Sequence, residues 1–326
     1  MAVSADTLRL AVAAQSAANV APTAPAYKLI RTTGEGLTFN PTTTQSAELD
    51  ARRSDKDSIL TGGEVSGDIN FELSKNDAFE ELLAGLMCSA WGNVGNAGGS
   101  ITADELVVGE TLFRKFIEKR FTIDPTGTPL YSYHRFLDCL VNTFSLSVSP
   151  NEPITGSFGF IGSQMLAPAS AEIASSSYAD AGTLPVFTAP LVSDIKLDRA
   201  SGTDIALNTY CFNSFSFNVT NNIRGLTCIG YLGNKSAVLG KCQVSISASI
   251  YFADDELLNM FLNSEEFSVT AEFRDSVAVP NKNSYKFTFP RCKLNSAKVT
   301  AGGTGHLVFH PQLECPPRRA RPGRGA

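Results

Sequence analysis

Two stretches of this chain, 179 residues apart, carry the same arrangement of apolar side chains, and this recurrence constrains the fold more than any other feature. In each stretch, apolar residues alternate with polar ones, and a short helical pattern follows directly. Alternation of this kind predicts a strand with one buried face. The recurrence indicates an internal duplication, although two unrelated strand-and-helix units would also look alike. The matching strand positions are Val65 and Val244, Ile69 and Ala248, Phe71 and Ile250, and Leu73 and Phe252.

The two helical patterns also match in register. In the first, Asn76 or Asp77 is the expected N-cap, because short polar side chains accept hydrogen bonds from free N–H groups there. In the second, the expected cap is Asp254 or Asp255. Apolar side chains spaced by three or four residues predict a helix lying against a sheet. They are Phe79, Leu82, Leu83, Leu86 and Met87 in the first helix, and Leu258, Phe261 and Leu262 in the second.

Further alternating stretches predict a mainly β chain. A long one spans residues 113–123, another spans residues 144–148, and a third follows a turn at Ser149–Asn151. Others span residues 215–219, 267–273 and 285–289.

The composition along the chain predicts five regions. Residues 1–27 are Ala-rich and are expected to form a peripheral N-terminal arm. Residues 28–165 and 206–310 are expected to form two similar β domains. Residues 166–205 contain few aromatic residues and much Ala, Ser and Pro, which is typical of a linker or surface insertion. Residues 311–326 are rich in Pro, Arg and Gly and are expected to be a flexible arm, a partner-binding tail or a frameshifted reading of the gene.

Charge and cysteine content exclude several kinds of protein. The formal net charge is −5, which argues against a sequence-specific DNA binder but suits a protein past which DNA slides. The seven cysteines form no Cys-x-x-Cys pair, so we expect no zinc site and interpret them as buried free thiols of a reducing cytoplasm. No apolar run approaches the ~20 residues of a membrane span, and we expect a soluble, unexported product.

The sequence shows no constellation typical of catalysis. A nucleophile elbow and a P-loop are both missing from it. His134, His306 and His310 are isolated, and His134 is most simply a strand residue. Asp254, Asp255 and Glu256 are better explained as helix-capping residues than as metal ligands. We therefore predict no enzyme activity and name no catalytic, cofactor-binding or metal-binding residue.

One predicted strand carries four basic residues, Arg114, Lys115, Lys119 and Arg120. A stripe for nucleic acid needs one basic face with aromatic residues for stacking. Here the basic residues are divided between both faces, which favours inter-subunit salt bridges or a solvated strand.

Several blocks of the sequence resemble, in order, the tail tube proteins of phages with long, non-contractile tails. They are Leu29–Leu37, Ala47–Asp55, Gly63–Leu73, Asp77–Leu86 leading to Trp91, Phe116–Phe121, Val141–Val148, Thr155–Phe158, Val219–Arg224, Tyr251–Asp255 and Tyr285–Arg291. The departure is at the end, where the family closes with a strand and this chain turns to Pro, Arg and Gly.

The resemblance implies two packed β-sheets flanked by a short helix, with subunits joined in a ring around a continuous β-barrel. Stacked rings would form the major tail tube of the virion, through which DNA passes without sequence-specific binding. Two tube domains in one chain favour three chains per ring, and six chains are the alternative. The implied partners are the tail-tip, tape-measure and terminator proteins, with synthesis in the bacterial cytoplasm. A carbohydrate-binding or adhesive β-sandwich of a virion, and a β-rich hydrolase, are the competing hypotheses. The residues that face the bore cannot be named from the sequence.

Overall fold

The structure, a computed structural model, describes residues 7–47, 57–95, 101–124, 129–199, 204–251, 254–276, 283–301 and 307–314. The chain is mainly β, as predicted, and its strands form several sheets that do not close into a barrel within the chain. The α-helices of the described part are α1 (Asp77–Met87) and α2 (Glu256–Leu262).

In the first half of the chain, one long strand, β9, takes part in two sheets. The first part of β9 pairs with β8, which pairs in turn with β1, whereas its second part pairs with β10. β10 pairs with β5, and β5 pairs with β3 and β4. The strands of this half are β1 (Arg9–Ala14), β2 (Ala26–Leu29), β3 (Gly34–Glu35), β4 (Thr38–Gln45), β5 (Ser58–Glu72), β8 (Lys115–Asp124), β9 (Leu130–Val148) and β10 (Thr155–Gly162).

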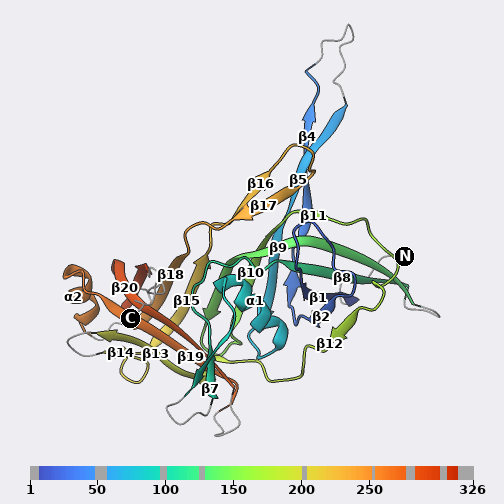
Figure 1. Ribbon diagram of the computed structural model, residues 1–326. Helices are drawn as coiled ribbons and strands as arrows, with labels where there is room; N and C mark the ends of the chain where they lie inside the picture. The colour runs from blue at the N-terminus through green and yellow to red at the C-terminus, as the bar shows by residue number, and fades with distance from the viewer. Residues whose placement is uncertain are drawn as a thin grey trace, which may run out of the picture.

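The second half repeats this pairing order. β20 pairs with β19 through its first part and with β21 through its second, β19 pairs with β13, β21 pairs with β18, and β18 pairs with β15. In Figure 1 the two halves lie side by side, with β1 and β8 at one end of the molecule and β13, β20 and α2 at the other. The strands are β13 (Val192–Arg199), β15 (Phe212–Thr220), β18 (Gln243–Tyr251), β19 (Phe267–Arg274), β20 (Ser284–Ala301) and β21 (Leu307–Glu314).

The two long strands match at the level of single residues. The pairing of β9 with β10 passes from Thr143 to Val141, which leaves Asn142 as an extra residue. The pairing of β20 with β21 skips Asn295 in the same way. Such bulges mark defined positions in a sheet. Aligning Asn142 with Asn295 also aligns Cys139 with Cys292, so the repetition extends to register and residue type.

The halves join through strand pairing as well as through the core. β15 pairs with β9 from Phe215 opposite Val148 to Thr220 opposite Thr143, so the sheets of the two halves form one continuous sheet. Beneath it lies a core in which the rings of Phe71, Phe144 and Phe158 stand 5.0–6.0 Å apart. Rings at such distances pack favourably.

Smaller elements complete the described chain. β6 (Gly92–Gly95) and β7 (Ile101–Glu105) form a hairpin, and so do β16 (Arg224–Thr227) and β17 (Asn234–Val238), which lie beside the projecting end of β4 and β5 (Figure 1). The remaining elements are β11 (Gln164–Met165), β12 (Ser177–Ala179), β14 (Ile205–Ala206) and a 3-10 turn at Ala189–Leu191.

Three predicted boundaries differ from the structure. Residues 9–14, expected in a peripheral arm, form β1, whose Leu10 and Val12 lie in the main core and whose Ala11 and Ala13 pack against Tyr27. Small residues suit this strand because both of its faces are buried. Residues 192–199, expected in a linker, form β13 because β19 offers a free edge there. Pro311–Glu314, expected in the tail, continue β21, while residues 315–326 and His306 lie outside the described part.

The helices begin where the sequence predicts. Asn76 caps α1 by accepting a hydrogen bond of 2.8 Å from the Phe79 N–H group. At the start of α2, the Asp254 carboxylate accepts a bond of 3.1 Å from the N–H of Glu256. The expected apolar face of α2 is not its buried face, since the structure buries Leu257 and Met260 instead.

The cysteines are only partly as predicted. Cys88 and Cys139 are buried free thiols, and burial raises the pKa of the Cys88 thiol to about 11. Cys211 and Cys228 are free but exposed, and Cys292 is disulfide-bonded. Spacing along the sequence could not show this bond, because it depends on the distance between two Cα atoms in the fold.

Candidate assembly and channel surface

One face of the continuous sheet carries rows of small polar side chains. Residues that pair directly across strands share a face, so a row can be followed from strand to strand. One row runs across Asn70, Ser157, Ser145, Asn218 and Ser245, and the next across Glu72, Thr155, Ser147, Ser216 and Ser247. Both rows cross from the first half into the second without interruption. These ten side chains include one charge, the carboxylate of Glu72.

The opposite face of the same strands is apolar and buried. The row that lies between the two polar ones consists of Phe71, Gly156, Leu146, Phe217 and Ile246. Its large side chains are at most 4% exposed. A sheet with one buried and one polar face is typical of antiparallel strands that meet water on one side. The polar rows therefore form a solvent-facing wall that spans both halves.

This sheet ends in two unpaired edges. Within the described residues, β3 and β4 pair only with β5, and β20 from Lys293 to Ala301 pairs only with β21. An open edge presents free N–H and C=O groups and readily pairs with another strand. Val299 on the β20 edge is 38% exposed although its equivalent in the first half, Leu146, is buried.

The two edges correspond to the strands that pair inside the chain. The bulges at Asn142 and Asn295 make β20 the equivalent of β9. Because β3 and β4 pair with β5 as β15 pairs with β18, they are the equivalents of β15. The internal junction of β9 with β15 is thus a pairing, within one chain, between the equivalents of the β20 edge and the β3–β4 edge.

The β3–β4 edge is closed at one point. Lys119 donates to the Leu37 carbonyl oxygen and pairs with Glu35, whose carboxylate also accepts a bond of 3.1 Å from the Leu37 N–H. The free part of this edge therefore begins after Leu37. This local closure leaves Thr38 and the residues that follow it available.

Three of the four basic residues, Arg114, Lys115 and Lys119, form ion pairs within the chain, so for these three the prediction of inter-subunit bridges or a solvated strand is wrong. Lys115 is 1% exposed and pairs with Glu81 of α1. Arg114 lies 3.5 Å from Asp138. Arg120 lies over the ring of Tyr131 at 4.6 Å. The strand alone could not reveal this, because the acids come from α1, β3 and β9.

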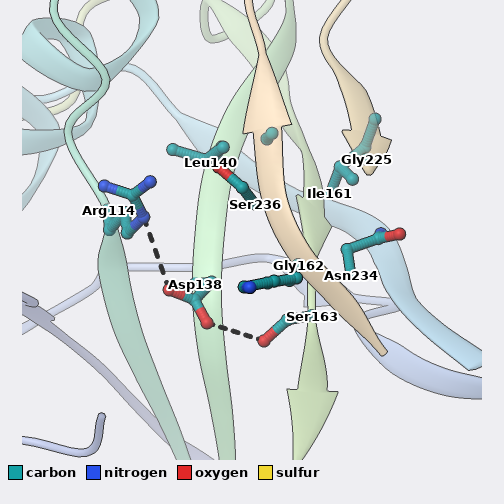
Figure 2. Close-up of a pocket in the computed structure, with 11 residues that line it drawn as sticks. Arg114, Asp138, Leu140, Ile161, Gly162, Ser163, Gly225, Asn234 and Ser236 are labelled. Atoms are coloured by element: carbon teal, nitrogen blue, oxygen red, sulfur yellow. Dashed lines mark hydrogen bonds and ion pairs between the residues drawn. The ribbon is translucent and has the colours of Figure 1, made fainter. Parts of the chain in front are cut away.

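A small cavity near the β16–β17 hairpin lies beside a hydrogen-bonded carboxylate, Asp138. Asp138 lies between Arg114 and Ser163, and its carboxylate accepts a bond of 2.7 Å from the Ser163 hydroxyl (Figure 2). The same carboxylate accepts a bond of 3.0 Å from the Gln15 amide. The cavity holds about 10 Å³, which is room for about one water molecule. Its contacts tie the N-terminal segment to β9 rather than open a ligand site.

Among the described residues, His134 and the acidic run at α2 show no catalytic arrangement. His134 is a strand residue of β9, as predicted, and its ring packs edge-on against Phe121 at 5.1 Å. Burial, with the nearby charge of Lys119, lowers the pKa of His134. Asp254 accepts a bond of 2.7 Å from the Tyr210 hydroxyl, and Glu256 pairs with Arg199. Across the described ranges, no three His, Cys, Asp or Glu side chains cluster as metal ligands would.

Neither described helix is long and apolar enough to cross a membrane.

The fold contains a large cleft of about 870 Å³ at the junction of the halves, between α1 and β20. Its floor is made of core residues such as Phe144 and Phe217.

The two edges were not predicted from the sequence, although the sequence contains a signal for them. Cys139 and Asn142 recur as Cys292 and Asn295, at a spacing different from the 179 residues that align the helices, because the loops between these elements differ in length.

Comparison with known proteins assigns the family. No curated protein matches the chain in sequence. Residues 6–308 match the family described as phage tail tube protein, which covers both halves and both edge strands. The chain therefore belongs to the phage tail tube protein family and is a structural protein of the virion tail.

Proposed function

We propose that this chain is the major tail tube subunit and that its copies close into rings by pairing the β20 edge of one copy with the β3–β4 edge of the next. The observation that carries the proposal is the junction of β9 with β15, where the same two kinds of edge already pair within one chain. Pairing between copies would remove both open edges, which otherwise favour uncontrolled association.

The internal junction predicts the register between copies. Ser145 pairs with Asn218 inside the chain, and the equivalents of these residues are Lys298 and Thr38. Lys298 of one copy is therefore expected opposite Thr38 of the next, with Ala297 opposite Phe39. Val299 then lies where Leu146 lies at the internal junction, which accounts for its exposure in a single chain.

Three copies are the preferred ring. Each chain supplies two equivalent units, so three chains give six units around the axis, and six chains are the alternative. Copies joined head to tail by unlike edges form a closed ring when the rotation between them closes. Rings that stack along the axis make an open tube.

The polar rows are proposed to line the bore. They lie on the face of the sheet opposite the core and would continue from copy to copy through the proposed edge pairing. Tight binding to phosphate requires Lys or Arg. The ten residues of the two rows contain neither, and Lys298, the equivalent of Ser145, is an isolated cation where the same face continues on β20. Hydroxyl and amide side chains keep the surface of the bore hydrated without binding DNA tightly, as DNA ejection through the bore requires. We assign no catalytic role to the chain, and the proposed partners are the tail-tip, tape-measure and terminator proteins of a long-tailed phage assembled in the bacterial cytoplasm.

Disulfide cross-linking tests the ring. The variant K298C/T38C is made in a C211S/C228S background, which removes the exposed native thiols. Direct cross-strand pairs have Cβ atoms about 5 Å apart, close to disulfide geometry. After oxidation we expect covalent dimers and trimers in a non-reducing gel and nothing larger, whereas bands up to six chains would establish the hexamer.

The matched control K298C/N40C displaces one cysteine by two residues on the same face and should cross-link poorly. Equal cross-linking of both variants would contradict the register. Negative-stain electron microscopy of the same samples should show hollow rings or tubes, and a monodisperse monomer at every concentration would contradict the assembly itself.

A further inference from the structure

The two helices of the repeat are covered very differently, although they occupy equivalent positions. On α1, the apolar stripe that includes Phe79, Leu82 and Leu83 is at most 4% exposed. The equivalent residues of α2, counted from the matching caps Asn76 and Asp255, are Leu258, Phe261 and Leu262. Leu258 and Phe261 are only half-buried, and Leu262 is 69% exposed.

The stripe of α1 is covered partly because the second half lies beside it. The ring of Phe79 lies 5.3 Å from that of Tyr285, and the Tyr285 hydroxyl donates to Glu80 over 3.5 Å. On the other side, the Asn221 amide donates to the Leu86 carbonyl oxygen over 2.7 Å. Thus α1 bridges from its own half to β20 and to the end of β15 in the next half.

Within the described part of the chain, no further half lies beside α2, which lies at the outer end of the molecule (Figure 1). The surface equivalent to Tyr285 and Phe287 of β20 is that of Ser132 and His134 on β9, at the opposite end. There, His134 and Phe121 are only half-buried and Ile123 is 38% exposed. An unmatched apolar face at one end and a half-covered apolar surface at the other fit head-to-tail contact.

We infer that α2 of one copy docks on the β8–β9 surface of the next copy, with Leu258, Phe261 and Leu262 contacting Phe121 and His134 there. This inference rests on the proposed ring, and it adds a second contact to each junction besides the edge pairing. The partner of α2 is a second copy of this chain, because α1 already packs on the second half within one chain. The docking of α2 on the first half of the next copy would repeat that contact between chains. The helix therefore joins neighbouring copies in the outer layer of the tube wall, and the paired strands join them in the inner layer.

Assembly of a charge variant tests the contact. Leu262→Asp removes an exposed apolar side chain, so the monomer should keep the circular dichroism and melting temperature of the wild type. Loss of the burial of one leucine at each junction should raise the protein concentration at half-maximal ring formation by about tenfold or more. The matched control Asn263→Asp adds the same charge at the next, exposed residue and should stay within about twofold of the wild type. Wild-type assembly of Leu262→Asp would overturn the inference.

A cross-link separates failure of the helix contact from failure of the ring. Asn259 and Ser132 are the equivalents of Glu80 and Tyr285, which touch within the chain. The variant N259C/S132C, in the C211S/C228S background and treated with a short bis-maleimide, should give covalent oligomers. If K298C/T38C cross-links but N259C/S132C gives only monomer, the helix contact is wrong and the ring stands. If neither variant cross-links and no rings form, the proposed function itself is wrong.

Discussion

The same structural position holds an ion pair in the first half of the molecule and an apolar pair in the second. In the first half, Lys115 of β8 meets Glu81 of α1. At the equivalent positions of β19 and α2 stand Phe267, 4% exposed, and Met260, fully buried. The strand register establishes the equivalence, because Lys115 pairs with Cys139 as Phe267 pairs with Cys292. The repeat shows that this fold accepts either solution.

The comparison teaches what a buried ion pair requires. Two charges taken out of water are tolerated when they meet each other, and an apolar pair of similar volume can replace them at little cost. Removal of one partner alone is costly because the other charge stays behind. The two halves of this chain carry the two alternatives, an ion pair and an apolar pair. Variants that place the residues of one half in the other test the exchange directly.

The largest effect is expected from Phe267→Lys, which places a lysine in the second half without its carboxylate. Met260 offers no charge to the new ammonium group, so we expect a loss of about 4 kcal/mol in the free energy of unfolding. Adding Met260→Glu should recover about 2 kcal/mol of this loss. Urea denaturation at concentrations below ring formation measures both. An unchanged midpoint for the single variant would show that the two positions are not equivalent.

The reverse exchange should have a smaller effect. Lys115→Ala leaves Glu81 with only its more exposed partner, Lys28, at 3.2 Å. It should cost about 3 kcal/mol through lost packing and the weaker compensation of the carboxylate. The double variant K115F/E81M copies the second half and should unfold within about 1 kcal/mol of the wild type. A double variant as unstable as the single one would mean that the first half depends on the charges themselves.

The pH dependence of the free energy of unfolding should distinguish the ion pair of the first half from the apolar pair of the second. Burial raises the pKa of Glu81, but the bonds to Lys115 and Lys28 outweigh it and hold that pKa below its ordinary value of 4.5. A carboxyl with a lowered folded-state pKa stabilises the fold above 4.5, and this stability is lost as the pH falls through the folded-state pKa. Between pH 7 and pH 3, the wild type should lose about 1 kcal/mol more than K115F/E81M. Parallel curves for the two proteins would contradict this account.

The smallest expected effect concerns Glu80, whose equivalent in the second half is the neutral Asn259. Burial raises the pKa of Glu80 above its ordinary value of 4.5, so its ionisation costs stability as the pH rises through that range. Glu80→Gln should therefore stabilise the protein at pH 7 by up to about 1 kcal/mol, with no gain below pH 4. A destabilised variant at pH 7 would mean that the bond from Tyr285 outweighs burial.

Most of the strands and both helices could be predicted, because their patterns are local. Alternation with a period of two places Phe144 and Leu146 on one face of β9 and Ser145 and Ser147 on the other, whichever strands lie beside them. The same pattern separates the core from the polar rows. It failed at β1, whose two buried faces left an Ala-rich stretch without clear alternation.

The partners of the strands and of the charges were decided only by the tertiary structure. Nothing near Lys115 in the sequence identifies Glu81, and nothing near Val148 identifies Phe215, because long-range pairs depend on how the two halves pack. The candidate assembly surface is of this kind, since an edge is defined by the strand that is missing beside it. The sequence by itself determined which side chains face the core, because side-chain direction follows from the backbone period. Only the fold decided which edges remain open, because each backbone hydrogen bond needs a neighbour that the period does not specify.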